Sequence, residues 1–193
     1  MKQLIGVQHV NEENELENVL AMLDFPRTAG LELPEDYKEK ESLGLVLFFF
    51  TKLTHCLHKR KVDVIPLENW SLSDRFYSLS YAKRILVGEH TREKLEREIQ
   101  SLENFISPYN PPEILYPAMH RVQRCRDVLS ILNSGVTLTD VISKWDDINV
   151  QREAYMLGKI MSCKPDVVII GNMHAKKLHH RLPEYTYLSS PAL

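Results

Sequence analysis

The sequence is poor in cysteine and contains no long apolar segment. Its 193 residues include only three cysteines, Cys56, Cys125 and Cys163, and this odd, widely spaced set is not typical of a disulfide framework or a zinc knuckle. The longest apolar run, residues 43–50, is far too short to cross a bilayer, and the N-terminus lacks the apolar core of a signal peptide. These absences predict a cytoplasmic protein with free thiols and without a membrane partner.

An excess of charge of one sign is also missing. Lysine and arginine number 24 against 26 aspartates and glutamates, and this near-neutral balance gives no electrostatic basis for binding nucleic acid. Neither a Walker A motif nor a G-x-G-x-x-G motif occurs, which disfavours a nucleotide-dependent enzyme. With 44% hydrophobic and 26% charged residues, the composition is that of a globular protein, and we expect one domain over residues 1–193.

Short apolar runs alternate with helical patterns along the chain. Apolar runs without strict alternation are typical of strands in a parallel sheet that is covered on both faces. The candidates are Gln3–Val7, Thr28–Leu33, Val62–Pro66, Asp166–Ile170 and, more weakly, Tyr185–Ser189. A helix-rich stretch from about 70 to 163 interrupts this order as an insertion. The sequence therefore predicts an α/β fold with a mostly parallel sheet of four to five strands and helices on both faces.

Two histidines and two glutamates lie at or just beyond the ends of the predicted strands. His9 and Glu68 each follow a strand by two residues, Glu32 lies at the end of the second strand, and His174 follows the fourth by four residues. In open parallel sheets, ligands bind outside the carboxyl ends of the strands. Imidazoles and carboxylates together suit Mn, Fe, Co or Zn. The alternative is that the histidines cap strand ends and that Glu32 pairs with an arginine.

Two glutamates occupy positions that should be buried. Glu32 lies between two leucines of a strand, and a buried carboxylate needs a metal, a hydrogen-bond donor or a cation as its partner. Glu153 falls on the core-facing stripe of the predicted last helix, Val150–Cys163, beside Arg152. Arg152 is one candidate partner for Glu32, and a structural arginine–glutamate network is the alternative to a direct catalytic role for Glu153.

Four short motifs bracket nearly the whole chain. They read Gly6-Val7-Gln8-His9, Leu31-Glu32-Leu33, Arg152-Glu153-Ala154-Tyr155-Met156 and Val167-Val168-Ile169-Ile170-Gly171-Asn172-Met173-His174. Together they resemble the TraB/Tiki superfamily, which includes ChaN-like proteins and the erythromycin esterases. The chain departs from the family pattern at Glu153, where Asp or Asn is usual, and residues 70–145 match nothing in it.

The resemblance implies a metal-dependent hydrolase acting on a peptide, an ester or a related small-molecule carbonyl substrate. Mn, Co or Zn would be held by some of His9, Glu32 and His174, with Glu68 as a further candidate. Whichever of Glu32 and Glu153 is not a ligand would act as general base, and Arg152 would stabilise negative charge or hold the carboxylates.

A rival hypothesis from another class keeps the fold without the catalysis. The protein would then be a small-ligand or haem-binding module, with His9 and His174 as axial ligands, or an interaction protein. Assembly into a homo-oligomer is a further alternative that the sequence leaves open. The His/Lys-rich stretch from His174 to Arg181 is interpreted as an exposed tail.

Overall fold

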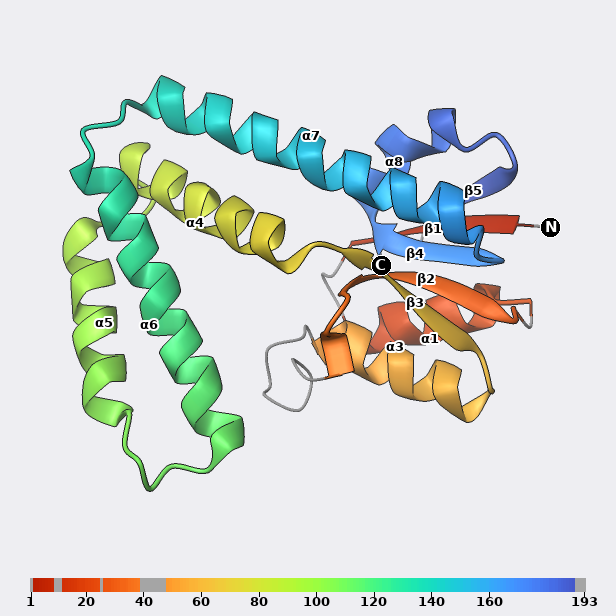
Figure 1. Cartoon of the computed structure of the whole chain (residues 1–193), viewed down its shortest axis with the longest axis horizontal. Helices are drawn as coiled ribbons and strands as arrows, with labels where there is room; N and C mark the ends of the chain where they lie inside the picture. Colours follow the sequence, from red (N-terminus) through yellow and green to blue (C-terminus); the bar gives the residue numbers. More distant parts are fainter. Residues whose placement is uncertain (1, 9–11, 25, 39–47, 190–193) are drawn as a thin grey trace. The chain divides into compact units, whose positions relative to one another are not determined.

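The chain forms two compact units. The computed structural model describes residues 2–8, 12–24, 26–38 and 48–189. The first unit comprises Met1–Tyr37, Val46–Asn69 and Glu153–Leu193, and the second comprises Lys38–Leu45 and Trp70–Arg152 (Figure 1). The boundary between Arg152 and Glu153 lies inside one continuous helix.

The first unit is built on a five-stranded parallel sheet. Its strands are β1 (Lys2–Val7), β2 (Thr28–Pro34), β3 (Asp63–Glu68), β4 (Val167–Gly171) and β5 (Tyr185–Ser189). Their order across the sheet is β3-β2-β4-β1-β5, and every strand pair is parallel. The predicted α/β fold is confirmed, and the weakest strand candidate forms the edge beside β1. Because β4 lies between β2 and β1, the carboxyl ends of these three strands adjoin.

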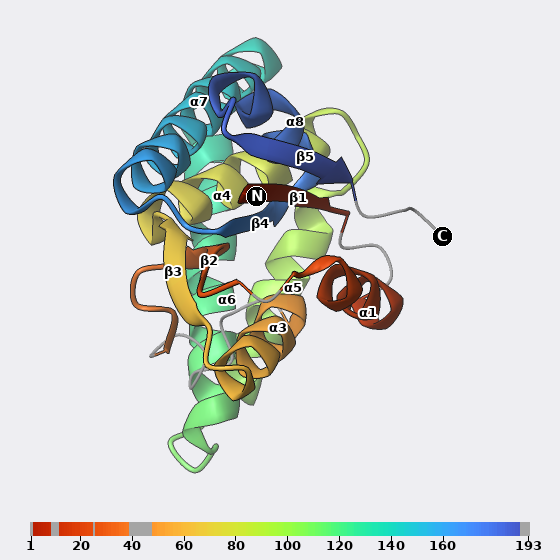
Figure 2. The same ribbon diagram turned by 90° about the vertical axis from the view of Figure 1, so that its right-hand side faces the viewer.

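Helices cover both faces of this sheet (Figure 2). On one face, α1 (Glu12–Met22) and α3 (Phe48–Lys59) pack on Ile5, Leu31 and Leu33. On the other face, the C-terminal part of α7 (Leu138–Cys163) and α8 (Asn172–Leu178) pack on Leu4 and on Val168 and Ile170 of β4. Adjacent residues of a strand point to opposite faces, so short apolar runs can fill both cores.

Close packing of α8 on β1 requires a residue without a side chain at Gly6. A Cβ atom there would lie 2.6 Å from Oδ1 of Asn172 and 3.1 Å from Cβ of Ala175. The hydroxyl group of Tyr187 donates a hydrogen bond to the same Asn172 oxygen, 2.5 Å away, which limits how far that oxygen can move. Gly6 therefore sets the position of the helix that carries His174.

We expect Gly6→Ala to lower the free energy of unfolding by about 2 kcal/mol, because the added methyl group overpacks the contact with α8. Gly158→Ala is the matched control. A Cβ at Gly158 meets nothing within 4 Å, and alanine there should leave stability unchanged or raise it by up to about 1 kcal/mol. Urea unfolding followed by circular dichroism measures both. Equal stability of the two variants would contradict the packing role of Gly6.

The second unit is helical. It contains α4 (Trp70–Leu86), α5 (Arg92–Phe105), α6 (Pro112–Asn133) and the N-terminal part of α7. Its core consists of Leu79, Ala82, Leu95, Cys125, Val128, Val141 and Ile148. In the part of the chain that is described, no helix is long and apolar enough to cross a membrane.

The last long helix begins earlier than the sequence predicts. We expected it to begin at Val150, but α7 begins at Leu138. Thr137 and Asp140 exchange hydrogen bonds at this end: the Thr137 N–H donates to Asp140 Oδ2 over 2.9 Å, and the Asp140 N–H donates to Thr137 Oγ1 over 3.2 Å. This reciprocal pair caps the helix, and Asp146 and Asp147, just before the predicted start, are exposed side chains within it.

Candidate functional site

Glu32 points from β2 toward the sheet face that α7 and α8 cover. Its neighbours Leu31 and Leu33 belong to the core on the opposite face, and alternation along the strand turns Glu32 away from them. The backbone N–H of Gly171, at the end of β4, donates to Glu32 Oε2 over 2.7 Å. Only 14% of the Glu32 side chain is exposed. The Glu32 carboxylate is therefore mostly buried, as predicted, and one of its oxygens accepts a backbone hydrogen bond.

His174 lies between two carboxylates. It is on α8, and its side chain is 11% exposed. Its Nδ1 atom lies 3.2 Å from Oε1 of Glu153 on α7, within hydrogen-bond distance. Its Nε2 atom lies 3.9 Å from Oε1 of Glu32. Residues from a strand and two helices, far apart in the sequence, thus meet around one imidazole ring.

Lys177 completes the arrangement. Its Nζ atom donates to Oε1 of Glu153 over 2.9 Å, and it lies on the same helix as His174, three residues further on. The Lys177 side chain is half exposed, while that of Glu153 is 15% exposed. We define Glu32, Glu153, His174 and Lys177 as the edge cluster. Sequence reasoning missed Lys177 because it interpreted residues 174–181 as a tail, whereas they form α8 and the short 3-10 helix His179–Arg181.

Glu68 and His9 are the two other predicted metal ligands. Glu68, at the end of β3, is 3% exposed and accepts the N–H of Asn69 at 3.2 Å. It pairs in register with Pro34 and so lies further along the edge that carries Glu32. His9 lies outside the described residues.

Sequence reasoning also missed Glu15, a carboxylate close to His9 in the sequence. Glu15 is on α1, is 6% exposed and accepts a hydrogen bond from the backbone N–H of Gln8. Its sequence signal is its position four residues before the buried Val19, which puts a charge on the apolar stripe of that helix.

Arg152 lies at the end of the second unit and is 2% exposed. Its guanidinium carbon is 4.5 Å from the centroid of the Phe76 ring, a cation–π contact within that unit. Arg152 and Glu153 are adjacent in the sequence and lie on one helix, but they belong to different units.

The donor set of the edge cluster fits a divalent metal ion in part. Histidine ligands usually hold a carboxylate with the other ring nitrogen, as Glu153 holds Nδ1 of His174, and this leaves Nε2 turned toward Glu32. Among residues 2–8, 12–24, 26–38 and 48–189, no group of three or more His, Cys, Asp or Glu side chains is arranged to hold a metal ion. The two facing donor atoms are therefore an incomplete ligand set.

Comparison of the chain with models of protein families, with curated proteins and with solved structures found no match.

Proposed function

We propose that the protein is a metal-dependent hydrolase of the TraB/Tiki type, acting on a peptide, ester or related carbonyl substrate. The observation that carries this proposal is the meeting of Glu32, Glu153 and His174 at the carboxyl edge of the parallel sheet. This edge is where open α/β folds bind their ligands. Retaining two carboxylates beside an imidazole ring in a mostly buried position costs stability, so such a cluster is typical of a functional site.

In this proposal, His174 and Glu32 supply two metal ligands. Two atoms that each bind one ion at about 2.1 Å can be at most about 4.2 Å apart. Nε2 of His174 and Oε1 of Glu32, at 3.9 Å, satisfy this limit. His9 would complete the set, with Glu68 as a further candidate, and Mn, Co and Zn suit these ligands. A bound ion would polarise the substrate carbonyl and lower the pKa of bound water.

The other residues of the edge cluster orient these groups and move the proton. Glu153 accepts the Nδ1 proton of His174 in a hydrogen bond, so the ring keeps Nε2 facing Glu32. Lys177 holds Glu153 from the solvent side. The Gly171 N–H holds one oxygen of Glu32, which leaves Oε1 toward the ring. Glu153, the carboxylate outside the ligand set, is the proposed general base that takes a proton from the attacking water.

Hydrolysis after metal removal tests the proposal. We expect chelator-treated protein to be inactive toward p-nitrophenyl esters and short peptides, and one of Mn, Co or Zn to raise its activity about 100-fold or more. His174→Ala should not recover activity, whereas the matched control His180→Ala, an exposed histidine in the same stretch, should recover it fully.

Activity that survives chelation unchanged would contradict metal dependence. Protein that hydrolyses neither substrate class with any of the three metals, but gives a Soret band on haem titration that is lost in His174→Ala, would favour the haem-binding rival instead.

A further inference from the structure

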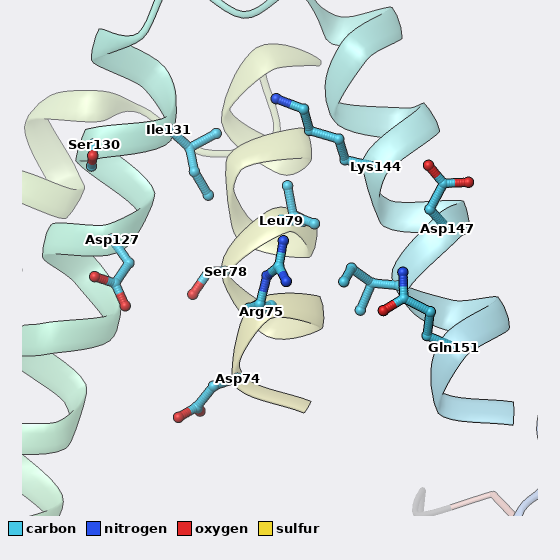
Figure 3. A pocket seen from close by; sticks show the side chains of 11 residues that line it. Asp74, Arg75, Ser78, Leu79, Asp127, Ser130, Ile131, Lys144, Asp147 and Gln151 are labelled. Carbon is cyan, nitrogen blue, oxygen red and sulfur yellow. The ribbon is translucent and has the colours of Figure 1, made fainter. Parts of the chain in front are cut away.

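The second unit contains a cavity of about 500 Å³ that the proposed function does not use (Figure 3). Three helices of that unit, α4, α6 and α7, line it. The lining residues are Asp74, Arg75, Ser78, Leu79, Asp127, Ser130, Ile131, Lys144, Asp147, Ile148 and Gln151. This volume lies within the range of about 300–1,000 Å³ that is typical of small-molecule sites.

Each helix turns one face toward the cavity. Lys144, Asp147 and Gln151 recur every three or four residues along α7, and Asp127 and Ile131 do so along α6. Helix faces that meet in a bundle are normally apolar. Here the buried base of the cavity is apolar, whereas most of the charged and amide side chains stand at exposed positions around its opening.

The floor of the cavity is buried. Ser78, Leu79 and Ile148 are 4%, 6% and 3% exposed. Leu79 and Ile148 also belong to the apolar core of the second unit. The cavity therefore offers apolar contact at its base and a hydroxyl group beside it.

Two of the charged lining residues already have partners: Asp127 accepts a hydrogen bond from Nε2 of Gln123 over 2.8 Å, and Asp74 forms an ion pair. The Asp74 carboxylate accepts a hydrogen bond from Nη2 of Arg124 over 2.5 Å and lies 3.0 Å from Nε2 of His120. Burial alone would raise the pKa of Asp74, but the hydrogen bonds from His120 and Arg124 outweigh it and lower that pKa. Asp74 thus stays ionised and paired, and in Figure 3 its side chain points away from the middle of the cavity.

Apart from Asp74, the charges of the lining balance in sign. The lining contains two cations, Arg75 and Lys144, and two further carboxylates, Asp127 and Asp147. The side chains of Arg75 and Asp147 form no hydrogen bond or ion pair with any other described residue. Figure 3 shows Arg75 between α6 and α7, with Lys144 and Gln151 extending from α7 toward α4. A ligand with a single charge sign would meet repulsion from one of the two pairs.

We propose that this cavity binds a small zwitterion, namely an amino acid or a short peptide with free termini. The Arg75 guanidinium can donate two parallel hydrogen bonds to the ligand carboxylate, with Lys144 as a second cation. Asp147 and Asp127 accept hydrogen bonds from the ligand ammonium group. Leu79 and Ile148 contact an apolar ligand side chain at the base of the cavity. The proposal depends on α4, α6 and α7 alone and is independent of the edge cluster.

Titration with leucine and with leucyl-leucine, followed by nuclear magnetic resonance of the full chain, tests the proposal. We expect saturable shifts at residues of α4, α6 and α7 with a Kd of about 1 mM or tighter. N-acetyl-leucyl-leucine amide, which lacks both charges, should bind at least about tenfold more weakly. Mass spectrometry of the recovered peptide establishes that it stays intact during the titration.

Two substitutions at the cavity and one beside it complete the test. Arg75→Gln and Asp147→Asn should each weaken binding of leucyl-leucine at least about tenfold. Asp146→Asn, an exposed carboxylate adjacent in α7 that does not line the cavity, should leave the Kd unchanged. All three positions are exposed, so the variants should fold. The proposal is wrong if neither probe saturates by about 10 mM, or if Arg75→Gln and Asp147→Asn bind as tightly as Asp146→Asn.

Discussion

Replacing Glu32 by glutamine is expected to lower hydrolysis about 100-fold or more while changing the free energy of unfolding by about 1 kcal/mol or less. The amide has the shape of the carboxylate, and its oxygen can still accept the hydrogen bond from the Gly171 N–H. What it loses is the negative charge that faces Nε2 of His174. Steady-state hydrolysis and urea unfolding, measured on the same preparation, separate the two effects.

Glu184→Gln, an exposed glutamate in the same unit, is the control and should change neither quantity. A loss of about 3–5 kcal/mol in Glu32→Gln would be the signature of a broken buried ion pair. In that case Glu32 would stabilise the fold, and the hydrolase proposal would lose its central carboxylate.

Replacing Arg152 by methionine is expected to lower the free energy of unfolding by about 3 kcal/mol. The side chain is 2% exposed, so its charge is compensated within the protein, and its cation–π contact with Phe76 contributes to the packing of the helical unit. Methionine fills part of the volume but supplies neither the charge nor the hydrogen-bond donors. Urea unfolding, with Arg97→Met at an exposed position of α5 as control, measures the effect.

The resemblance to the TraB/Tiki superfamily implies a different outcome for the same variant. If Arg152 stabilises charge in the reaction, Arg152→Met loses hydrolysis while its unfolding curve stays close to that of the wild type. A large stability loss assigns Arg152 to the fold instead. The two outcomes are distinguishable in a single experiment on one variant.

The α/β fold was predictable because short apolar runs bounded by turn residues are the signal that a covered parallel sheet leaves in a sequence. The rule that ligands bind at the carboxyl edge was enough to select Glu32 and His174 together. The order of the strands was not predictable, since many orders bury the same runs. It is the order β3-β2-β4-β1-β5 that makes β2 and β4 neighbours and brings the Gly171 N–H to Glu32.

The partners of Glu153 could not be predicted from the sequence. Its position on the apolar stripe of α7 predicted a partnered carboxylate, but the candidate considered was the adjacent Arg152. The structure gives it His174 and Lys177, both from α8. Helical periodicity identifies which face of a helix is buried, whereas the element packed on that face depends on the tertiary fold.

The charged cavity of the second unit could not be predicted from the sequence for the same reason. Lys144 and Asp147, three positions apart on α7, have the pattern of a solvated helix face. The adjacent Asp74 and Arg75 on α4 carry no distinguishing spacing. Only the fold turns Arg75 and Asp147 toward one shared space. Residues 70–145, which matched no motif, thus contribute most of the lining of this cavity, and Asp147, Ile148 and Gln151 complete it.

The central claim, that the edge cluster is a metal site, is tested most directly by calorimetric titration of the chelator-treated protein with Mn, Co and Zn. The account predicts that one of these ions binds with one ion per chain and a Kd of about 10 μM or tighter. His174→Ala should weaken that binding at least about tenfold, and His180→Ala should not change it. Absence of binding by all three ions, or an affinity that is the same in His174→Ala as in the wild type, would contradict the account.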